Sequence, residues 1–304
     1  MIVQLKCKVN ISFKKVFIFL SQICIIYVKS INQALSGLSA VSICVEEGAF
    51  MRIVIKLGTS TLAHSTGLLN IRRVEEICKV VSDVKNAGNE IILVSSGAIG
   101  MGAGKLALKE KPADIPTKQA AASVGQCELM YTYDKIFSDY NHIVAQLLLT
   151  GDDLKDDERH NNFNNTLSRL LQLGALPIIN ENDTVAVEEI RIGDNDTLAA
   201  IVAQSINADV LVLFSDIDGL YTADPHKDKN AKLISSVSCI DDSIKALAGG
   251  RGTKFGTGGM VTKLNAADIC LNCGCDMIIT NGNRPESLYD IVEGKAVGTK
   301  FSRK

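Results

Sequence analysis

Glu90-Ile91-Ile92-Leu93-Val94 is the most informative stretch for the class of fold, because its last four residues are apolar without interruption. A half-exposed strand alternates apolar and polar residues, whereas a short continuous apolar run is typical of a strand that is buried on both faces of a sheet. The run leads into Ser95-Ser96-Gly97-Ala98, small polar residues that suit the start of a helix. The stretch therefore predicts a buried parallel strand followed by a helix.

The same pattern repeats on both sides of this stretch. Further apolar strands are expected at 52–57, 143–148, 176–179, 209–214 and 276–280. Helices are expected over about 71–87, 117–138, 158–173, 196–206 and from 260 onward, with a short helix finishing the chain. Strands of this kind, alternating with amphipathic helices, predict an α/β fold with a parallel sheet that helices cover on both faces.

The first fifty residues read differently from the rest. Phe17 to Val28 is a nearly continuous apolar run that follows Lys14 and Lys15. It is too short to span a bilayer, although it could serve as the apolar part of a signal peptide. Since Met51 stands directly before a strong strand, we expect 1–50 to be an extension that is not native or is disordered, with a targeting segment as the alternative. Residues 51–304 are expected to form one domain.

Composition sets limits on the class of function. A net charge of −2 gives no electrostatic reason to expect nucleic acid as a partner, and no stretch predicts a membrane span. Nine cysteines without a regular framework indicate reduced thiols in a cytoplasmic protein. The group Cys270, Cys273 and Cys275 is expected to pack at a helix end rather than to bind a metal.

Ligands of such sheets bind beyond the carboxyl ends of the strands, so the residues that follow each strand are the candidates for chemistry. Lys56 lies near the end of the first strand, shortly before Gly58-Thr59-Ser60. Gly256-Thr257-Gly258-Gly259-Met260-Val261-Thr262-Lys263 is a glycine-rich loop that leads into a helix. Backbone N–H groups at such a helix start attract anions, and both lysines add positive charge. Phosphate is therefore the expected ligand.

Two further loops are acidic and rich in amides. They are Asn180-Glu181-Asn182-Asp183-Thr184 and Gly193-Asp194-Asn195-Asp196-Thr197, and in the second we expect Asp196 to cap the following helix. Carboxylates accept from an ammonium group and amides donate to a carboxylate, so these loops suit a zwitterionic acceptor. Ser215-Asp216 follows another strand and faces the same crevice.

Together these loops predict phosphoryl transfer, which depends on positioning and on positive charge around the phosphoryl oxygens. Lys56 and Lys263 with Mg²⁺ supply that charge, and Asp194 or Asp196 can orient the lysines or bind the acceptor. An acceptor that is itself a carboxylate is ionised at neutral pH and needs no general base.

At this point six motifs, in order and at sensible spacings, resemble the glutamate 5-kinases of the amino acid kinase family over 51–304. They are Lys56–Ser60, Ser96–Ile99, Asn180–Asp183, Gly193–Asp196, Gly219–Pro225 and Gly256–Lys263. The resemblance implies a three-layer αβα sandwich with an open, mainly parallel sheet of about eight strands. It implies transfer of the ATP γ-phosphoryl group to the γ-carboxylate of L-glutamate, with ATP and Mg²⁺, as the first step of proline biosynthesis.

The resemblance also implies roles for particular residues. Lys56, Lys263 and Asp196 are the expected catalytic residues. Ser96, Asp183 and Asn195 would bind glutamate, with Asn180 and Asp194 in support. The nucleotide would contact Lys56, Ser215, Asp216 and the run Thr257, Gly258, Gly259, Met260, Val261, Thr262 and Lys263. No residue is assigned as a metal ligand. Family members are commonly homo-oligomers, are often inhibited by proline, and can pass their product to glutamate-5-semialdehyde dehydrogenase.

Two departures from the family pattern stand out. Many members carry a C-terminal PUA domain, and we expect this chain to be a short form without it; the first fifty residues have no recognised counterpart. The alternatives within the fold are kinases of N-acetylglutamate, aspartate, carbamate or UMP. A non-catalytic amino-acid sensor is the alternative from another class, and it predicts loss of a lysine that this chain retains.

Overall fold

The structure is a computed structural model that describes residues 50–303, apart from 65, 67, 111, 187–193, 226 and 249–258. The predicted nucleotide contacts Thr257 and Gly258, and the expected extension before Phe50, therefore lie outside the described residues.

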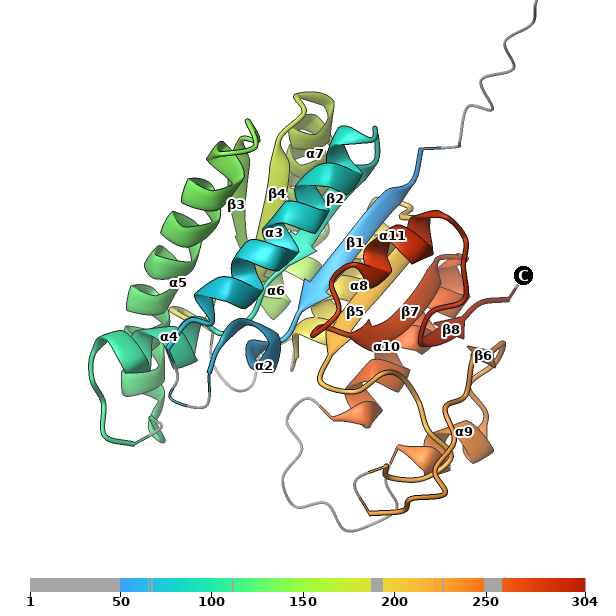
Figure 1. Cartoon of the computed structure of the whole chain (residues 1–304). Coiled ribbons are helices and arrows are strands. Elements are labelled where there is room, and N and C mark those ends of the chain that lie inside the picture. The colour runs from blue at the N-terminus through green and yellow to red at the C-terminus, as the bar shows by residue number, and fades with distance from the viewer. Residues whose placement is uncertain are drawn as a thin grey trace, which may run out of the picture. The chain divides into compact units, whose positions relative to one another are not determined.

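One eight-stranded sheet forms the centre of the described domain. Its strands are β1 (Arg52–Leu57), β2 (Glu90–Val94), β3 (Val144–Leu149), β4 (Leu176–Glu181), β5 (Val210–Ser215), β6 (Ser236–Val237), β7 (Asp276–Asn281) and β8 (Thr299–Phe301). Their order across the sheet is β3-β4-β2-β1-β5-β7-β8-β6 (Figure 1). Every neighbouring pair is parallel except β7 and β8. The predicted open, mainly parallel sheet is confirmed.

Helices cover both faces of this sheet. They are α2 (Thr59–Leu62), α3 (Ile71–Asn86), α4 (Ala98–Lys105), α5 (Ile115–Ser138), α6 (Gly151–Lys155), α7 (Asp157–Gln172), α8 (Asn195–Ser205), α9 (Asp242–Leu247), α10 (Met260–Cys273) and α11 (Ser287–Val292). One hydrophobic core contains side chains of α3, α5 and α11, and a second contains side chains of α7, α8 and α10. The three-layer αβα sandwich is visible in Figure 1, where α3 and α5 lie in front of the sheet.

Strand β1 joins the two cores. Ile53 and Ile55 point into the core beneath α3, and Val54 points into the core beneath α8. All three side chains are fully buried, which is why the strand shows no alternation of apolar and polar residues. Each such side chain contributes about 1.5–3 kcal/mol by leaving water.

The sheet reverses its direction of growth at β1. The chain adds β2 on one side of β1, and it later returns to place β5 on the other side. The helices that follow the two neighbouring strands leave a crevice beyond the carboxyl end of β1, where open α/β sheets bind their ligands. The topology therefore places the site before any side chain is considered.

The far edge of the sheet differs from the prediction. The expected C-terminal helix is α11, but β8 follows it and pairs antiparallel with β7. Strand β4 also continues past the expected end at 179, because Asn180 and Glu181 pair with Leu148 and Leu149 of β3. Cys270 and Cys275 are buried at the end of α10, as predicted, but Cys273 is exposed.

Candidate active site

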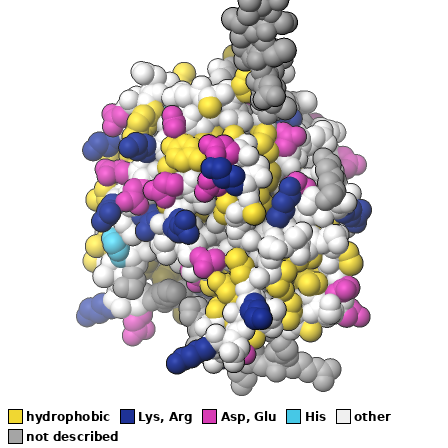
Figure 2. Space-filling view, turned by 45° about the vertical axis from the view of Figure 1, so that its right-hand side comes forward, with side chains coloured by type: hydrophobic (Ala, Val, Ile, Leu, Met, Phe, Trp, Pro, Cys, Tyr) yellow, Lys and Arg dark blue, Asp and Glu magenta, His cyan; other side chains and the backbone are white. Residues whose placement is uncertain are grey.

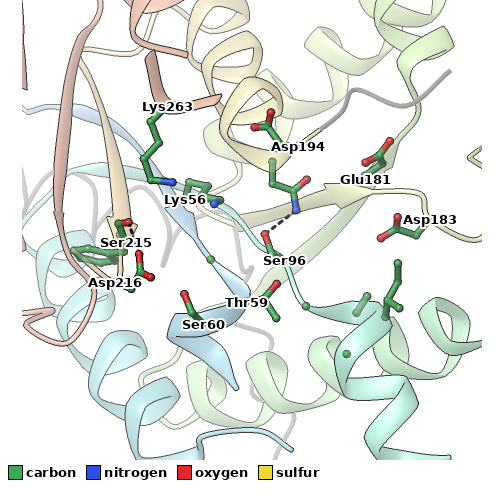
Figure 3. Close-up of a pocket in the computed structure, with 17 residues that line it drawn as sticks. Lys56, Thr59, Ser60, Ser96, Glu181, Asp183, Asp194, Ser215, Asp216 and Lys263 are labelled. Atoms are coloured by element: carbon green, nitrogen blue, oxygen red, sulfur yellow. Dashed lines mark hydrogen bonds between the residues drawn. The ribbon is translucent and has the colours of Figure 1, made fainter. Parts of the chain in front are cut away.

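A cleft of about 410 Å³ lies beyond the carboxyl ends of β1, β2, β4 and β5. It is lined by Lys56, Gly58, Thr59, Ser60, Ser96, Gly97, Ala98, Ile99, Gly100, Glu181, Asp183, Asp194, Asn195, Phe214, Ser215, Asp216 and Lys263. Figure 3 shows Ser215 and Asp216 at one end of the cleft and Glu181 and Asp183 at the other. Lys56 and Ser96 lie between the two ends.

Asp196 holds the two lysines together. The ammonium nitrogen of Lys56 lies 2.6 Å from Oδ1 of Asp196, and that of Lys263 lies 3.1 Å from Oδ2. The side chains are 12%, 9% and 1% exposed for Lys56, Lys263 and Asp196. Charges this far from water must be paired, so the three side chains form one fixed unit. With both lysines as ammonium ions, the unit carries one positive charge.

The ionisation of Asp196 follows from its surroundings. Burial raises the pKa of this carboxyl, but the charges and hydrogen bonds of Lys56 and Lys263 outweigh that effect, and the pKa lies below its ordinary value. Asp196 is therefore ionised at neutral pH, as an orienting group for two ammonium ions must be. The hydroxyl of Thr262 donates a further bond to Oδ2 at 2.9 Å.

The helix starts bring these groups to the cleft. Lys263 lies in the first turns of α10, whose N-cap Gly259 supplies no side-chain hydrogen bond. Asp196 lies in the first turn of α8, and the predicted helix cap was wrong by two residues. The cap is Asp194, whose side chain accepts from the backbone N–H groups of Asp196 and Thr197 at 2.7 and 2.8 Å. This leaves Asp196 free to face the lysines.

The start of α4 forms a further wall of the cleft. Its N-cap Gly97 has a φ of 94°, in the left-handed region that favours glycine. Next to it, Ser96 Oγ accepts a hydrogen bond of 2.8 Å from Nδ2 of Asn195, drawn in Figure 3. Asn180 does not line the cleft but accepts from the same Nδ2 at 3.0 Å, consistent with its predicted supporting place.

A second cavity, of about 590 Å³, adjoins the end of the cleft that Ser215 and Asp216 line. Asp216 lines both cavities. The second cavity is lined by residues that follow β5, by residues at the end of α9 and by Met260. Besides Asp216 and Met260, its lining residues are Ile217, Gly219, Leu220, Tyr221, Thr222, Ala223, Asp224, Pro225, Lys227, Ala246, Leu247 and Ala248. Its size and mainly apolar lining suit a planar heterocycle.

The structure brings most of the predicted site residues to the first cleft. The predicted residues that line it are Lys56, Ser96, Asp183, Asp194, Asn195, Ser215, Asp216 and Lys263. Asn180 and Asp196 lie directly behind it. Of the predicted nucleotide-binding run, Met260 lines the second cavity, Val261 is exposed, and Thr262 bonds to Asp196. Gly259 is the N-cap of α10, next to Met260.

Nine of the lining residues were not among the predicted site residues, and three of these nine carry polar side chains. These are Thr59 and Ser60, which come after β1 and Gly58, and Glu181, the last residue of β4. Their position at or just after the end of a strand was the available signal, because the carboxyl ends of parallel strands meet at the cleft. On the molecular face of Figure 2, basic and acidic side chains are interspersed, as the small net charge leads one to expect.

Comparisons with known proteins relate this chain to one family. Residues 51–281 match the model of the amino acid kinase family. A glutamate 5-kinase of Clostridium perfringens is 50% identical over 257 residues, covering 83% of this chain and 96% of the relative. A glutamate 5-kinase of Clostridium acetobutylicum is 53% identical over 250 residues, covering 82% of this chain and 94% of the relative.

Solved structures share the fold at much lower identity. An isopentenyl phosphate kinase of T. acidophilum in a product complex is 19% identical with a TM-score of 0.59, covering 82% of this chain and 99% of that one. Carbamate kinase from Giardia lamblia bound to AMP-PNP is 18% identical with a TM-score of 0.59, covering 84% of this chain and 100% of that one. These likenesses support the fold alone. Among the described residues, no helix has the length and apolar character to cross a membrane.

Proposed function

The chain belongs to the amino acid kinase family, and from this premise we propose that it transfers the γ-phosphoryl group of ATP to the γ-carboxylate of L-glutamate. The product is L-glutamyl 5-phosphate, and the reaction is the first step of proline biosynthesis. The choice of acceptor is supported by relatives named glutamate 5-kinase that are about half identical over most of both chains. The observation that carries the chemistry is the convergence of Lys56 and Lys263 on Asp196.

In the proposed reaction, an oxygen of the substrate carboxylate attacks the γ-phosphorus. The bond between that phosphorus and the bridging oxygen breaks, and its electron pair leaves with ADP. No proton is removed from the carboxylate at neutral pH, so the site needs no general base. The ammonium groups of Lys56 and Lys263 face the cleft at its middle, where negative charge on the phosphoryl oxygens needs partners.

The acceptor end has groups of the right polarity for a free amino acid. Glu181, Asp183 and Asp194 contribute carboxylates that suit the substrate ammonium group. An acylated amine, as in N-acetylglutamate, carries no charge there and would leave these carboxylates without that partner. This feature favours glutamate over N-acetylglutamate, the alternative acceptor closest to it in chemistry.

The opposite end suits the nucleotide. Ser215 and Asp216 lie beside the lysines, and the second cavity beyond Asp216 offers room for the base. Among the described residues, no cluster of three or more His, Cys, Asp or Glu side chains could hold a metal by itself. Mg²⁺ is typically held by substrate phosphates with one or two carboxylates. Asp216 is the carboxylate placed to help, and Mg²⁺ would add charge neutralisation.

Several finer points are part of the proposal. The chain would act as a homo-oligomer, be inhibited by proline, and pass its product to glutamate-5-semialdehyde dehydrogenase, as the family resemblance implies. Its location would be the cytoplasm, where buried free thiols such as Cys78, Cys270 and Cys275 stay reduced.

The test is ADP release from Mg-ATP with a panel of acceptors: L-glutamate, N-acetyl-L-glutamate, L-aspartate, carbamate and UMP. Hydroxylamine in the assay traps an acyl phosphate as its hydroxamate. We expect glutamate-dependent ADP release with formation of γ-glutamyl hydroxamate. Turnover with another acceptor would leave the role of the lysines intact, but it would show that the residues assigned to glutamate binding are wrong. A folded protein that binds glutamate but turns over no acceptor would support the sensor instead.

A further inference from the structure

The acceptor end of the cleft is held by a chain of side-chain amides that begins on α5. Gln126 Oε1 accepts from Asn180 Nδ2 at 2.8 Å. Asn180 Oδ1 accepts from Asn195 Nδ2 at 3.0 Å, and the same Nδ2 donates to Ser96 Oγ at 2.8 Å. Gln126 does not line the cleft. It therefore reaches the substrate end only through its neighbours.

Backbone groups fix the direction of every bond in this chain. The N–H of Glu181 can only donate, and it donates to Asn180 Oδ1 at 2.9 Å. The carbonyl of Ser95 can only accept, and it accepts from Asn195 Nδ2 at 2.8 Å. Asn180 must therefore turn its NH₂ group toward α5. The partner there has to offer an acceptor, and Gln126 does so.

This polarity decides what the cleft presents to a substrate. The two N–H bonds of the Asn195 amide are shared among Ser95, Ser96 and Asn180, so Asn195 has only Oδ1 left to offer as an acceptor. Ser96 Oγ already accepts from Asn195, and within the described residues no bond donated by its hydroxyl is found. An ammonium group matches the first atom and a carboxylate matches the second, the two groups of a free α-amino acid.

Helix α5 fixes this arrangement of amides through several contacts. Asn180 is 1% exposed, so its NH₂ group has no ready access to water as a substitute partner. Tyr133 lies two turns after Gln126 on the same helix, and its hydroxyl contacts Ser95 Oγ at 2.9 Å. A Cβ on Gly125 would meet the carbonyl oxygen of Ala98 at 1.8 Å, so α5 lies directly against the start of α4. Helix α5 thus contacts the acceptor side of the cleft twice, at Asn180 of β4 and at Ser95, which follows β2.

We propose that Gln126 is a positioning residue for the acceptor: it fixes the orientation of the Asn180 amide and, through Asn195, the polarity of the groups that bind the amino acid. The proposal rests on the glutamate kinase activity proposed above. It assigns to Gln126 an effect on glutamate affinity and none on the nucleotide.

The test compares two substitutions of equal length. Gln126→Met removes the acceptor, and Gln126→Glu keeps it. We expect Gln126→Met to raise KM for glutamate about tenfold, the change that corresponds to losing one hydrogen bond to a buried amide. KM for ATP should stay at its wild-type value, and the thermal midpoint of Gln126→Met should fall modestly, because a buried N–H of Asn180 loses its acceptor. Gln126→Glu should restore KM for glutamate to near wild type. Gln204→Met, on the exposed side of α8, is the matched control.

An unchanged KM for glutamate in Gln126→Met would overturn the proposal. So would a Gln126→Glu variant as impaired as Gln126→Met, because the acceptor would then be irrelevant. A parallel rise in KM for glutamate and in KM for ATP would assign Gln126 a general structural role instead. Failure of the activity itself is separate: wild-type protein without glutamate-dependent turnover contradicts both proposals, whereas an active wild type with a normal Gln126→Met variant contradicts only this one.

Discussion

The ammonium group of Lys56, at the end of β1, lies 2.6 Å from a carboxylate oxygen of Asp196, in the first turn of α8. The other oxygen of the same carboxylate holds Lys263 from α10. Three elements that are distant in sequence are thus connected through one buried acid. The fold delivers two positive charges to one place, and Asp196 keeps them there without neutralising both.

Replacing Asp196 by Asn tests this arrangement. The substitution leaves two buried ammonium groups without a counter-charge, which should lower the free energy of unfolding by about 3–5 kcal/mol. Because the lysines would separate, kcat should fall about 100-fold. Urea unfolding and steady-state kinetics measure the two effects. The control is Asp276→Asn, which breaks a 2.8 Å ion pair with Lys300 at the surface and should cost under about 1 kcal/mol. Equal effects of the two variants would contradict the account.

Stability should depend on pH through the same residue. The folded pKa of Asp196 lies below its ordinary value, so on acidification the unfolded chain takes up the proton first. The stabilisation is therefore complete above the unfolded pKa of about 3.9 and is lost as pH falls through the folded pKa. The difference in unfolding free energy between wild type and Asp196→Asn should be constant from pH 7 to 5 and shrink below about pH 4. A constant difference down to pH 3 would exclude this origin.

Removing Lys263 should reduce turnover more than affinity. Lys263→Met keeps the apolar stem and deletes the charge, so we expect kcat to fall about 100- to 1,000-fold, as for loss of a group that stabilises transition-state charge. KM for glutamate should change little. Lys79→Met, on the exposed face of α3, is the control and should be silent. Normal kcat in Lys263→Met would remove the lysine from the chemistry.

Replacing Asp183 should have the opposite effect on kinetics, changing affinity more than turnover. It lies at the acceptor end of the cleft, away from Ser215 and Asp216 (Figure 3). Asp183→Ala should therefore raise KM for glutamate with a smaller effect on kcat, because the lost contact is made before and during the reaction alike. Kinetics at varied glutamate and fixed saturating ATP measure it. A fall in kcat alone would place Asp183 elsewhere in the mechanism.

The crossing of α4 and α5 allows a test of packing within one helix. A Cβ on Gly102 would lie 1.7 Å from the carbonyl oxygen of Ala121, whereas one on Gly100 would have only Thr59 Cγ2 near it, at 3.9 Å. Gly102→Ala should lower the free energy of unfolding by about 1–3 kcal/mol. Gly100→Ala should raise it by about 0.5–1 kcal/mol, because alanine favours helix. Thermal unfolding of both variants measures the two effects. Equal midpoints would contradict the close approach of Gly102 to the backbone of α5.

The sequence predicted the central strands well because they are buried on both faces and carry continuous apolar runs. It missed β6 and β8, which are two and three residues long and too short for any periodicity. It also missed α9, a six-residue helix without buried residues. These pieces form through tertiary pairing, which local sequence does not encode.

Most of the site residues named from the sequence lie at one cleft, because post-strand positions are recognisable along the chain. The cap of α8 was misplaced because both Asp194 and Asp196 suit an N-cap, and only the lysines from β1 and α10 decide between them. Gln126 gave no signal at all. It is a half-exposed residue in the middle of a long helix, and its partner Asn180 comes from a distant strand.

The most direct test of the central claim follows an oxygen atom. L-Glutamate labelled with ¹⁸O in its γ-carboxylate is incubated with the protein, Mg-ATP and hydroxylamine, and the released phosphate is analysed by mass spectrometry. If the carboxylate attacks the γ-phosphorus, hydroxylamine then expels a phosphate that carries one ¹⁸O from glutamate, together with γ-glutamyl hydroxamate. Phosphate without ¹⁸O would mean that water, not the glutamate carboxylate, accepts the phosphoryl group, and the proposed function would be wrong.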